Sequence, residues 1–137
     1  MNVFDIVGPI MIGPSSSHTA GAVRIGNAAR KELGDTPPST AVISLYGSFA
    51  ATYKGHATDK ALIAGLLGFA PDDARIQQSL ALAAEAGLDF RFEVMEYDSK
   101  YPHPNTAVIE ATSSSGSSLK IKGESLGGGM VNIEVLT

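Results

Sequence analysis

The sequence predicts an α+β domain in which helices pack on one face of a largely antiparallel sheet. Helical patterns prevail in the first part of the chain, and alternating strand patterns prevail in the last part. A serine- and glycine-rich turn joins two of these strands and predicts a hairpin. The length of 137 residues suits a single domain covering residues 1–137.

A helix is predicted over residues 19–33, and a strand follows over 40–46. Gly34 and the Pro37-Pro38 pair mark the end of the helix. The strand reads TAVISLY, a run dense in β-branched residues that is typical of a buried strand.

Two further helices come next. The helix over 60–69, capped by Thr58 or Asp59, is apolar on nearly all sides. We therefore expect it to be central to the core or partly covered by a partner. The helix over 74–86 is preceded by two aspartates that can cap it, and Gly87 ends it.

The last part of the chain predicts four strands. Residues 89–94 alternate polar and apolar side chains. Residues 106–112 and 118–122 form the predicted hairpin, and 130–136 alternate again.

Composition excludes several classes of protein. The net charge is −4 and no Lys/Arg cluster stands out, which argues against nucleic-acid binding. No apolar run approaches the roughly 20 residues of a membrane span, and the first residues lack the basic region of a secretory signal. The chain contains no cysteine. It therefore cannot form disulfides or ligate an iron–sulfur cluster through thiolates, and this composition suits a cytoplasmic protein.

Four segments depart from the core pattern and contain all three histidines of the chain. We name them the serine segment (13–21), the lysine–histidine segment (46–59), the proline turn (103–106) and the glycine segment (123–130). Three histidines could bind a metal, but spacings of 38 and 47 residues match no local ligand motif. A Ser–His–Asp hydrolase lacks its usual GxSxG turn here.

The serine segment reads GPSSSHTAG. One hydroxyl is enough to cap a helix, so three serines and Thr19 leave hydroxyls to spare. Unpaired N–H groups and the positive end of a helix dipole suit a carboxylate or phosphate, and His18 can move a proton near pH 7. The residues alone leave both an elaborate cap and an anion site open.

The lysine–histidine segment places Lys54, His56 and Asp59 within six positions. Asp59 is more typical of a helix cap and Lys54 of a solvated lysine. His56 stands between Gly55 and Ala57 and has little bulk to pack against. Together these groups would suit an anionic substrate and proton transfer.

The other two segments carry weaker signals. His103 and Asn105 flank Pro104 in a turn composition. The run Gly127–Gly129 allows positive φ and a close approach of a ligand to backbone N–H groups, although a plain turn between strands explains it as well.

In this order, GPSSSHTAG, GSFAATYKGHATD, HPNTA and SLGGG resemble the β subunit or β domain of bacterial iron–sulfur-dependent L-serine dehydratase. The resemblance spans nearly the whole chain. It implies conversion of L-serine to pyruvate and ammonia without pyridoxal phosphate, with a [4Fe–4S] cluster held by an α subunit or domain. It implies no metal site in this chain, inactivity without the α partner, and a possible homodimer.

The resemblance also implies a fold and a set of site residues. The family's β part is similar to the allosteric substrate-binding domain of some 3-phosphoglycerate dehydrogenases, and we expect the ACT domain that commonly follows it to be absent from this chain. His18 and His56 are the implied catalytic residues. The implied substrate-binding residues are Ser15, Ser16, Ser17, Thr19, Lys54, His103, Asn105, Gly127, Gly128 and Gly129. Glycine is usual in the family where Ala57 stands, so positive φ there would add strain.

Two other functions stay open at this point. The chain could be a regulatory domain that senses an anion or an amino acid without catalysis. It could also be an interaction domain whose contact is the apolar helix 60–69.

Overall fold

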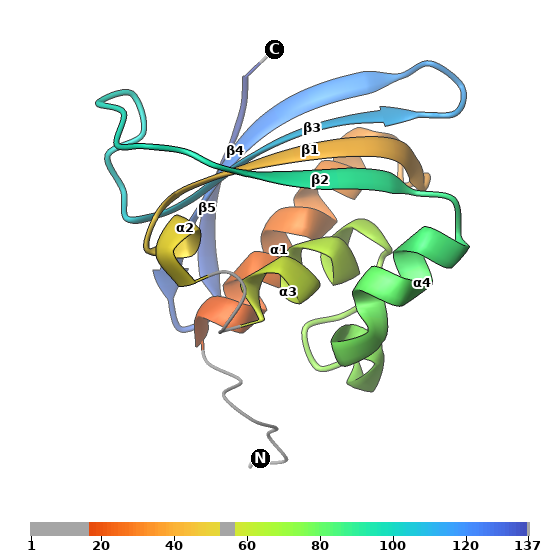
Figure 1. The fold of residues 1–137 in the computed structure, drawn as a ribbon, viewed down its shortest axis with the longest axis horizontal. Helices are drawn as coiled ribbons and strands as arrows, with labels where there is room; N and C mark the ends of the chain where they lie inside the picture. Colours follow the sequence, from red (N-terminus) through yellow and green to blue (C-terminus); the bar gives the residue numbers. More distant parts are fainter. Residues whose placement is uncertain (1–16, 53–56, 137) are drawn as a thin grey trace.

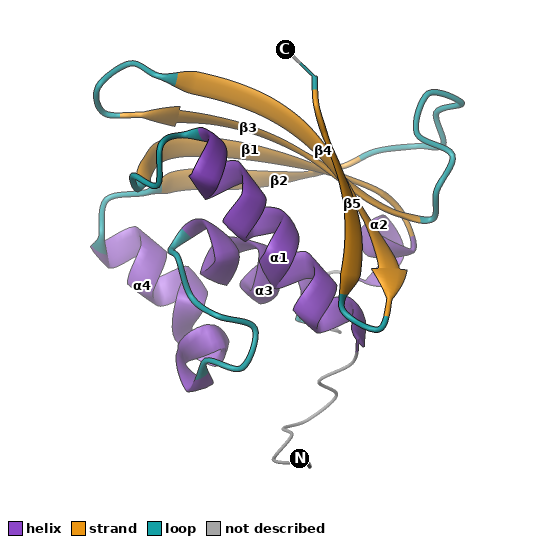
Figure 2. Ribbon diagram, turned by 180° about the vertical axis from the view of Figure 1, so that it is seen from behind, coloured by secondary structure: helices purple, strands orange, loops and turns teal. Residues whose placement is uncertain are grey.

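The structure is a computed structural model that describes residues 17–52 and 57–136. It confirms the predicted α+β class, since α1, α3 and α4 lie on one face of a five-stranded sheet (Figures 1 and 2). Within the described ranges, no helix is long and apolar enough to cross a membrane.

Helices form at the three predicted places. The helical elements are α1 (Ser17–Glu32), α2 (Ser48–Thr52), α3 (Thr58–Leu66), the 3₁₀ helix η1 (Ala74–Gln78) and α4 (Ser79–Glu85). The predicted helix over 74–86 is thus a 3₁₀ turn followed by a short α-helix. Its cap is Asp73, whose carboxylate accepts the backbone N–H of Arg75 at 2.8 Å. For α3, the sequence predicts Thr58 or Asp59 as the cap. This prediction is wrong, because Ala57 is the N-cap residue of α3.

The five strands form one sheet in the order β2-β1-β3-β4-β5. Their bounds are β1 (Pro38–Gly47), β2 (Asp89–Val94), β3 (Asn105–Ser113), β4 (Ser118–Gly127) and β5 (Met130–Val135). All neighbours are antiparallel except β1 and β2, which are parallel because α3 and α4 form the crossover between them.

The core lies between the helices and the sheet. Helix α1 packs against β4 and β5, and α3 packs against α1. Residues 61–66 of α3 are completely buried. The apolar helix is therefore central to this chain's own core, and its proposed role as an exposed contact of an interaction domain is wrong.

Two glycines let α1 and α3 approach each other closely. A Cβ atom on Gly26 would lie 2.3 Å from the carbonyl oxygen of Leu62, and one on Gly65 would lie 2.1 Å from that of Val23. Both distances are far below van der Waals contact, so this crossing requires glycine in each helix.

The opposite face of the sheet carries charged side chains. Lys122 alternates with the core residue Ile121 and pairs with Glu134 at 3.0 Å and Glu124 at 3.5 Å. The hydrogen bond to Glu134 is the largest of the effects that raise the pKa of Lys122.

Candidate functional site

The lysine–histidine segment and the proline turn meet where β1 ends and β3 begins. Gly47 pairs with Asn105 across these strands, and the N–H of Ser48 donates to the carbonyl of Pro104 at 2.5 Å. A Cβ atom on Gly47 would lie 2.3 Å from the same carbonyl oxygen. The close approach of α2 to the proline turn therefore depends on glycine at position 47.

The glycine segment reaches the same end of the sheet. Thr106 at the start of β3 pairs with Glu124 on β4, and the β4–β5 turn follows. The turn lies beside the beginning of α1 (Figure 2). A Cβ atom on Gly21 of α1 would lie 2.4 Å from the hydroxyl oxygen of Ser125. The described parts of all four segments thus gather at one end of the sheet, which we call the site end.

The proline turn fixes its own histidine. His103 Nδ1 accepts the backbone N–H of Asn105 at 3.1 Å. The hydroxyl of Thr106, which is completely buried, donates to the carbonyl of His103 at 2.7 Å. Because Nδ1 is an acceptor, the neutral imidazole carries its proton on Nε2 and can donate a hydrogen bond there.

Tyr46 is a polar group of the site end that the sequence analysis did not select. It is only 7% exposed, and its ring centroid lies 5.0 Å from that of Tyr101. Burial is the main cause that raises its pKa, followed by the charges of Tyr101, Asp98 and Glu93. The phenol therefore keeps its proton. The sequence signal that could have identified Tyr46 is its place as the last residue of a predicted buried strand.

Ala57 adopts the positive φ that would add strain to a residue other than glycine. Ala57 has φ of 63° and ψ of 16°, in the left-handed region, and its side chain makes no capping hydrogen bond. Instead, Asp59 in the first turn of α3 accepts the N–H of Lys60 at 2.8 Å. This helix start is held by a backbone conformation that favours glycine.

The glycine segment uses three successive left-handed residues. Gly127, Gly128 and Gly129 have φ of 92°, 63° and 77°. The sequence allows positive φ at these glycines, and all three adopt it. The carbonyl of Gly129 accepts a hydrogen bond from Nη1 of Arg24 on α1. Arg24 was missed because, in the sequence, it is one ordinary polar position on a helix.

The remaining predicted site residues are placed in part. Ser17 and His18 are the first residues of α1, and Thr19 and Asn105 are half-buried. Four predicted residues lie outside the described residues: Ser15, Ser16, Lys54 and His56. Within residues 17–52 and 57–136, no group of three or more His, Asp or Glu side chains could hold a metal ion.

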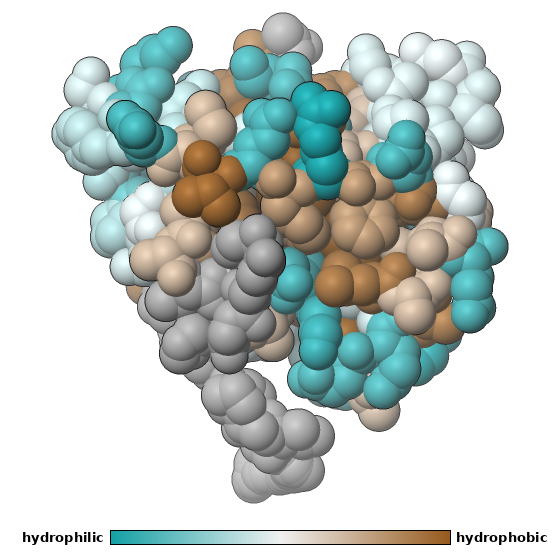
Figure 3. Space-filling model, viewed as in Figure 1, coloured by the Kyte–Doolittle hydropathy of each residue, from teal (hydrophilic) through white to brown (hydrophobic). Residues whose placement is uncertain are grey.

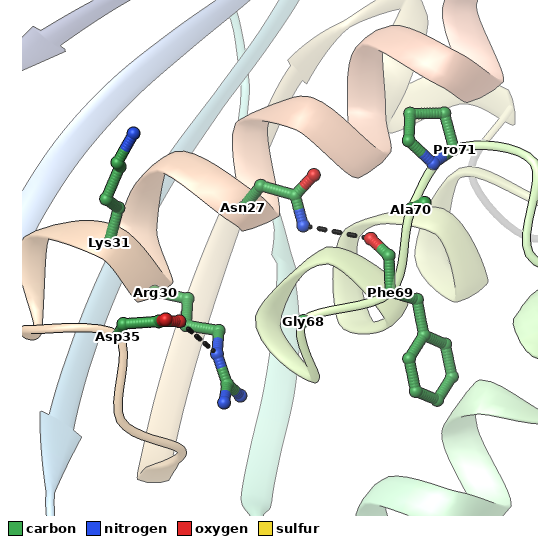
Figure 4. A pocket seen from close by; sticks show the side chains of 8 residues that line it. All are labelled: Asn27, Arg30, Lys31, Asp35, Gly68, Phe69, Ala70 and Pro71. Atoms are coloured by element: carbon green, nitrogen blue, oxygen red, sulfur yellow. Dashed lines mark hydrogen bonds and ion pairs between the residues drawn. The ribbon is translucent and has the colours of Figure 1, made fainter.

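A surface hollow lies elsewhere, beside the second half of α1 (Figure 4). Arg30 pairs with Asp35 at 2.9 Å and also donates to the carbonyl of Leu66 at 3.2 Å. The amide of Asn27 donates to the carbonyls of Gly65 and Phe69, each at 3.0 Å. These groups join α1 to the end of α3, so the hollow is part of the helix packing and not of the site.

Comparison with known proteins gives the family. The family model described as serine dehydratase beta chain matches residues 2–135. A probable L-serine dehydratase beta chain from Bacillus subtilis is 50% identical over 135 residues, which cover 98% of this chain and 60% of the relative. The L-serine dehydratase beta chain of Peptoniphilus asaccharolyticus is 45% identical over 132 residues, covering 96% and 59%. L-serine dehydratase TdcG of Escherichia coli is 45% identical over 82 residues, covering 57% and 18%.

The chain spans about 60% of the length of the two beta chains it matches. The match with the family model includes all four polar segments and both layers of the fold. This chain therefore belongs to the serine dehydratase beta chain family.

Proposed function

We propose that this chain is the β part of an L-serine ammonia-lyase that converts L-serine to pyruvate and ammonia. The observation that supports this most is that the described parts of the four polar segments, which are far apart in the sequence, meet at one end of the sheet. Segments that were only turns or helix caps would not need to lie close together. We also propose a cytoplasmic location, which the absence of cysteine supports.

The substrate carboxylate binds at the start of α1 in this proposal. Helix α1 has 16 residues and no acidic residue in its first turn, so its positive end faces no side-chain anion of that turn. Backbone N–H groups at a helix start favour a carboxylate. The hydroxyls of Ser15, Ser16, Ser17 and Thr19 are the proposed additional donors, and Lys54 is a proposed cationic contact.

Proton transfer falls to His18 and His56 in this proposal, because the reaction must remove the α-proton of serine. His103 has a different role. Its Nδ1 already accepts the N–H of Asn105, so the neutral ring offers Nε2–H as a donor. We assign it, with Asn105, to holding the substrate, while the glycines of residues 127–129 allow the backbone to come close.

The [4Fe–4S] cluster belongs to an α partner in this proposal. This chain has no cysteine, so its residues do not fit a thiolate-ligated cluster. When bound to the partner, such a cluster supplies a Lewis acid for the serine hydroxyl. Exposed apolar side chains at the end of β2 and around the β4–β5 turn support a protein partner at the site end; they are Val94, Met95, Leu126 and Met130. Apolar residues also gather across the middle of the face drawn in Figure 3.

The first prediction tests the histidines in the assembled enzyme. We expect His18→Ala and His56→Ala, each co-purified anaerobically with the α partner, to lower kcat for pyruvate formation by roughly 10²–10⁴-fold, as the loss of a general acid or base does. A coupled assay of pyruvate measures the rate. Ser115→Ala, in the exposed turn between β3 and β4, is the control and should keep the rate unchanged.

Three outcomes would count against this function. Near-normal kcat in both histidine variants would remove their catalytic role. Pyruvate formed by the purified, cofactor-free chain alone would overturn the need for a partner cluster. Serine binding without turnover in the complete mixture would instead indicate a regulatory amino-acid-sensing domain.

A further inference from the structure

One side chain joins α1, the helix that contains the end of the serine segment, directly to the glycine segment. Arg24 lies on α1, in the turn of helix after Ala20, and its Nη1 donates to the carbonyl of Gly129. The two residues are 105 positions apart in the sequence. The contact therefore ties the beginning of α1 to the β4–β5 turn.

The turn is shaped to accept this guanidinium. A Cβ atom on Gly129 would lie 2.7 Å from Nη1 of Arg24 and 3.7 Å from the Cβ of Ala20. Gly127 and Gly128 also have positive φ, but a Cβ atom on either would meet nothing within 4 Å. Gly127 and Gly128 thus allow the chain to bend, whereas Gly129 also leaves space for the side chain of Arg24.

A second contact holds the other side of the turn. Ser125, which is completely buried, faces Gly21 so closely that a Cβ on Gly21 would overlap its hydroxyl. The contacts of Ser125 and Gly129 lie on either side of the turn and hold it against the first two turns of α1. The exposed backbone of Gly128 is left between them, beside the helix start.

We infer that Arg24 is a positioning residue, which sets the place of the Gly127–Gly128 backbone relative to the start of α1 and thereby supports substrate binding. The contact itself is independent of the proposed function, whereas its consequence for L-serine rests on that function. Arg24 carries no proton in the reaction and is not a catalytic residue.

The test compares variants in the complex with the α partner. We expect Arg24→Ala to raise KM for L-serine about tenfold, because the turn loses the hydrogen bond that holds it beside the helix start, with a smaller change in kcat. We also expect faster amide hydrogen exchange at residues 127–130, but not in the distant turn at residues 114–117. Arg24→Lys, which keeps the charge and one donor, should recover part of the KM.

A variant of Gly129 tests the same contact by changing the residue that Arg24 binds. Gly129→Ala should raise KM as Arg24→Ala does, because its methyl group displaces the guanidinium. Gly116→Ala is the matched control: it also places alanine at positive φ, 96°, in open space far from the site, and should leave KM unchanged.

Each result decides the inference. Unchanged exchange at residues 127–130 in Arg24→Ala overturns the contact. Faster exchange with unchanged KM, or a fall in kcat alone, overturns the positioning role. If the wild-type complex forms no pyruvate, the proposed function fails, and the exchange experiment still decides whether Arg24 holds the turn.

Discussion

The two ends of the sheet both carry turns rich in small polar residues, but these turns are held in different ways. At the far end, where β3 meets β4, the turn closes on itself. The N–H of Ser113 donates to the carbonyl of Ser117 at 2.8 Å, and the hydroxyls of Ser113 and Ser115 lie 2.8 Å apart. Gly116 occupies the position of positive φ. Every one of these contacts lies within five residues.

At the site end, the contacts join segments that are distant in sequence. Ser48 bonds to Pro104, and Arg24 bonds to Gly129. A residue other than glycine, Ala57, takes up a left-handed conformation there, as Asp35 does before β1, but alanine tolerates this conformation less well than aspartate. The comparison teaches that serine and glycine content alone does not distinguish these two turns, whereas their contacts with segments distant in sequence do.

The largest expected effect breaks a long-range contact at the site end. We expect Gly47→Ala to lower the free energy of unfolding by about 3 kcal/mol, because its Cβ would overlap the backbone of Pro104 and its φ of 63° disfavours alanine. Urea denaturation followed by circular dichroism measures this loss.

Gly116→Ala at the far end is the control for Gly47→Ala. Its φ of 96° also disfavours alanine, but its Cβ would meet nothing within 4 Å, so we expect a loss of about 1 kcal/mol. Equal losses for the two variants would mean that the contact with Pro104 adds nothing, and the distinction between the two ends would fail.

Much of the fold follows from local pattern. The alternation of Phe90 and Phe92 predicts β2 with its observed bounds, and the serine-rich turn predicts the hairpin of β3 and β4. The sequence does not predict α2, because its five residues are too few to show a helical period. It also places the end of β4 too early, at residue 122, because Gly123 interrupts the apolar alternation. That glycine faces Ile25 of α1, a contact visible only in the folded chain.

The candidate site is predictable only in part. Its four segments stand out by composition, so the sequence predicts His103 and the glycines of the β4–β5 turn as site residues. Their meeting depends on strand register, which pairs Gly47 with Asn105 and Thr106 with Glu124. Arg24 could not be found, since nothing local distinguishes it from other charged helix residues.

The next prediction concerns the strain at the site end. We expect Ala57→Gly to raise the free energy of unfolding by about 1 kcal/mol, because relief of the left-handed conformation exceeds the entropic cost of glycine, and glycine is also the better N-cap. Thermal and urea unfolding measure the gain.

Ala81→Gly is the matched control for Ala57→Gly, because Ala81 is exposed within α4 and has no such strain. There the same substitution should cost about 1 kcal/mol. Destabilisation in both variants would show that Ala57 is not strained.

The smallest expected effect tests a purely local contact, as in the far turn. Arg75 lowers the pKa of Asp73, chiefly through a side-chain hydrogen bond, from 3.8 to about 2. The folded state therefore binds a proton at Asp73 less readily than the unfolded state does. The stabilisation is complete above pH 4 and is lost as the pH falls from about 4 towards 2.

Asp73→Asn should remove this part of the acid dependence while its amide oxygen still caps η1. Urea midpoints at pH 7 and at pH 2.5, each with and without 1 M salt, test it. We expect a small loss at pH 7 that salt reduces, because Arg75 is largely exposed, and a smaller loss at pH 2.5, where the stabilisation is only partly present. A loss at pH 7 as large as that of Gly47→Ala would contradict the idea that local contacts contribute less than long-range ones.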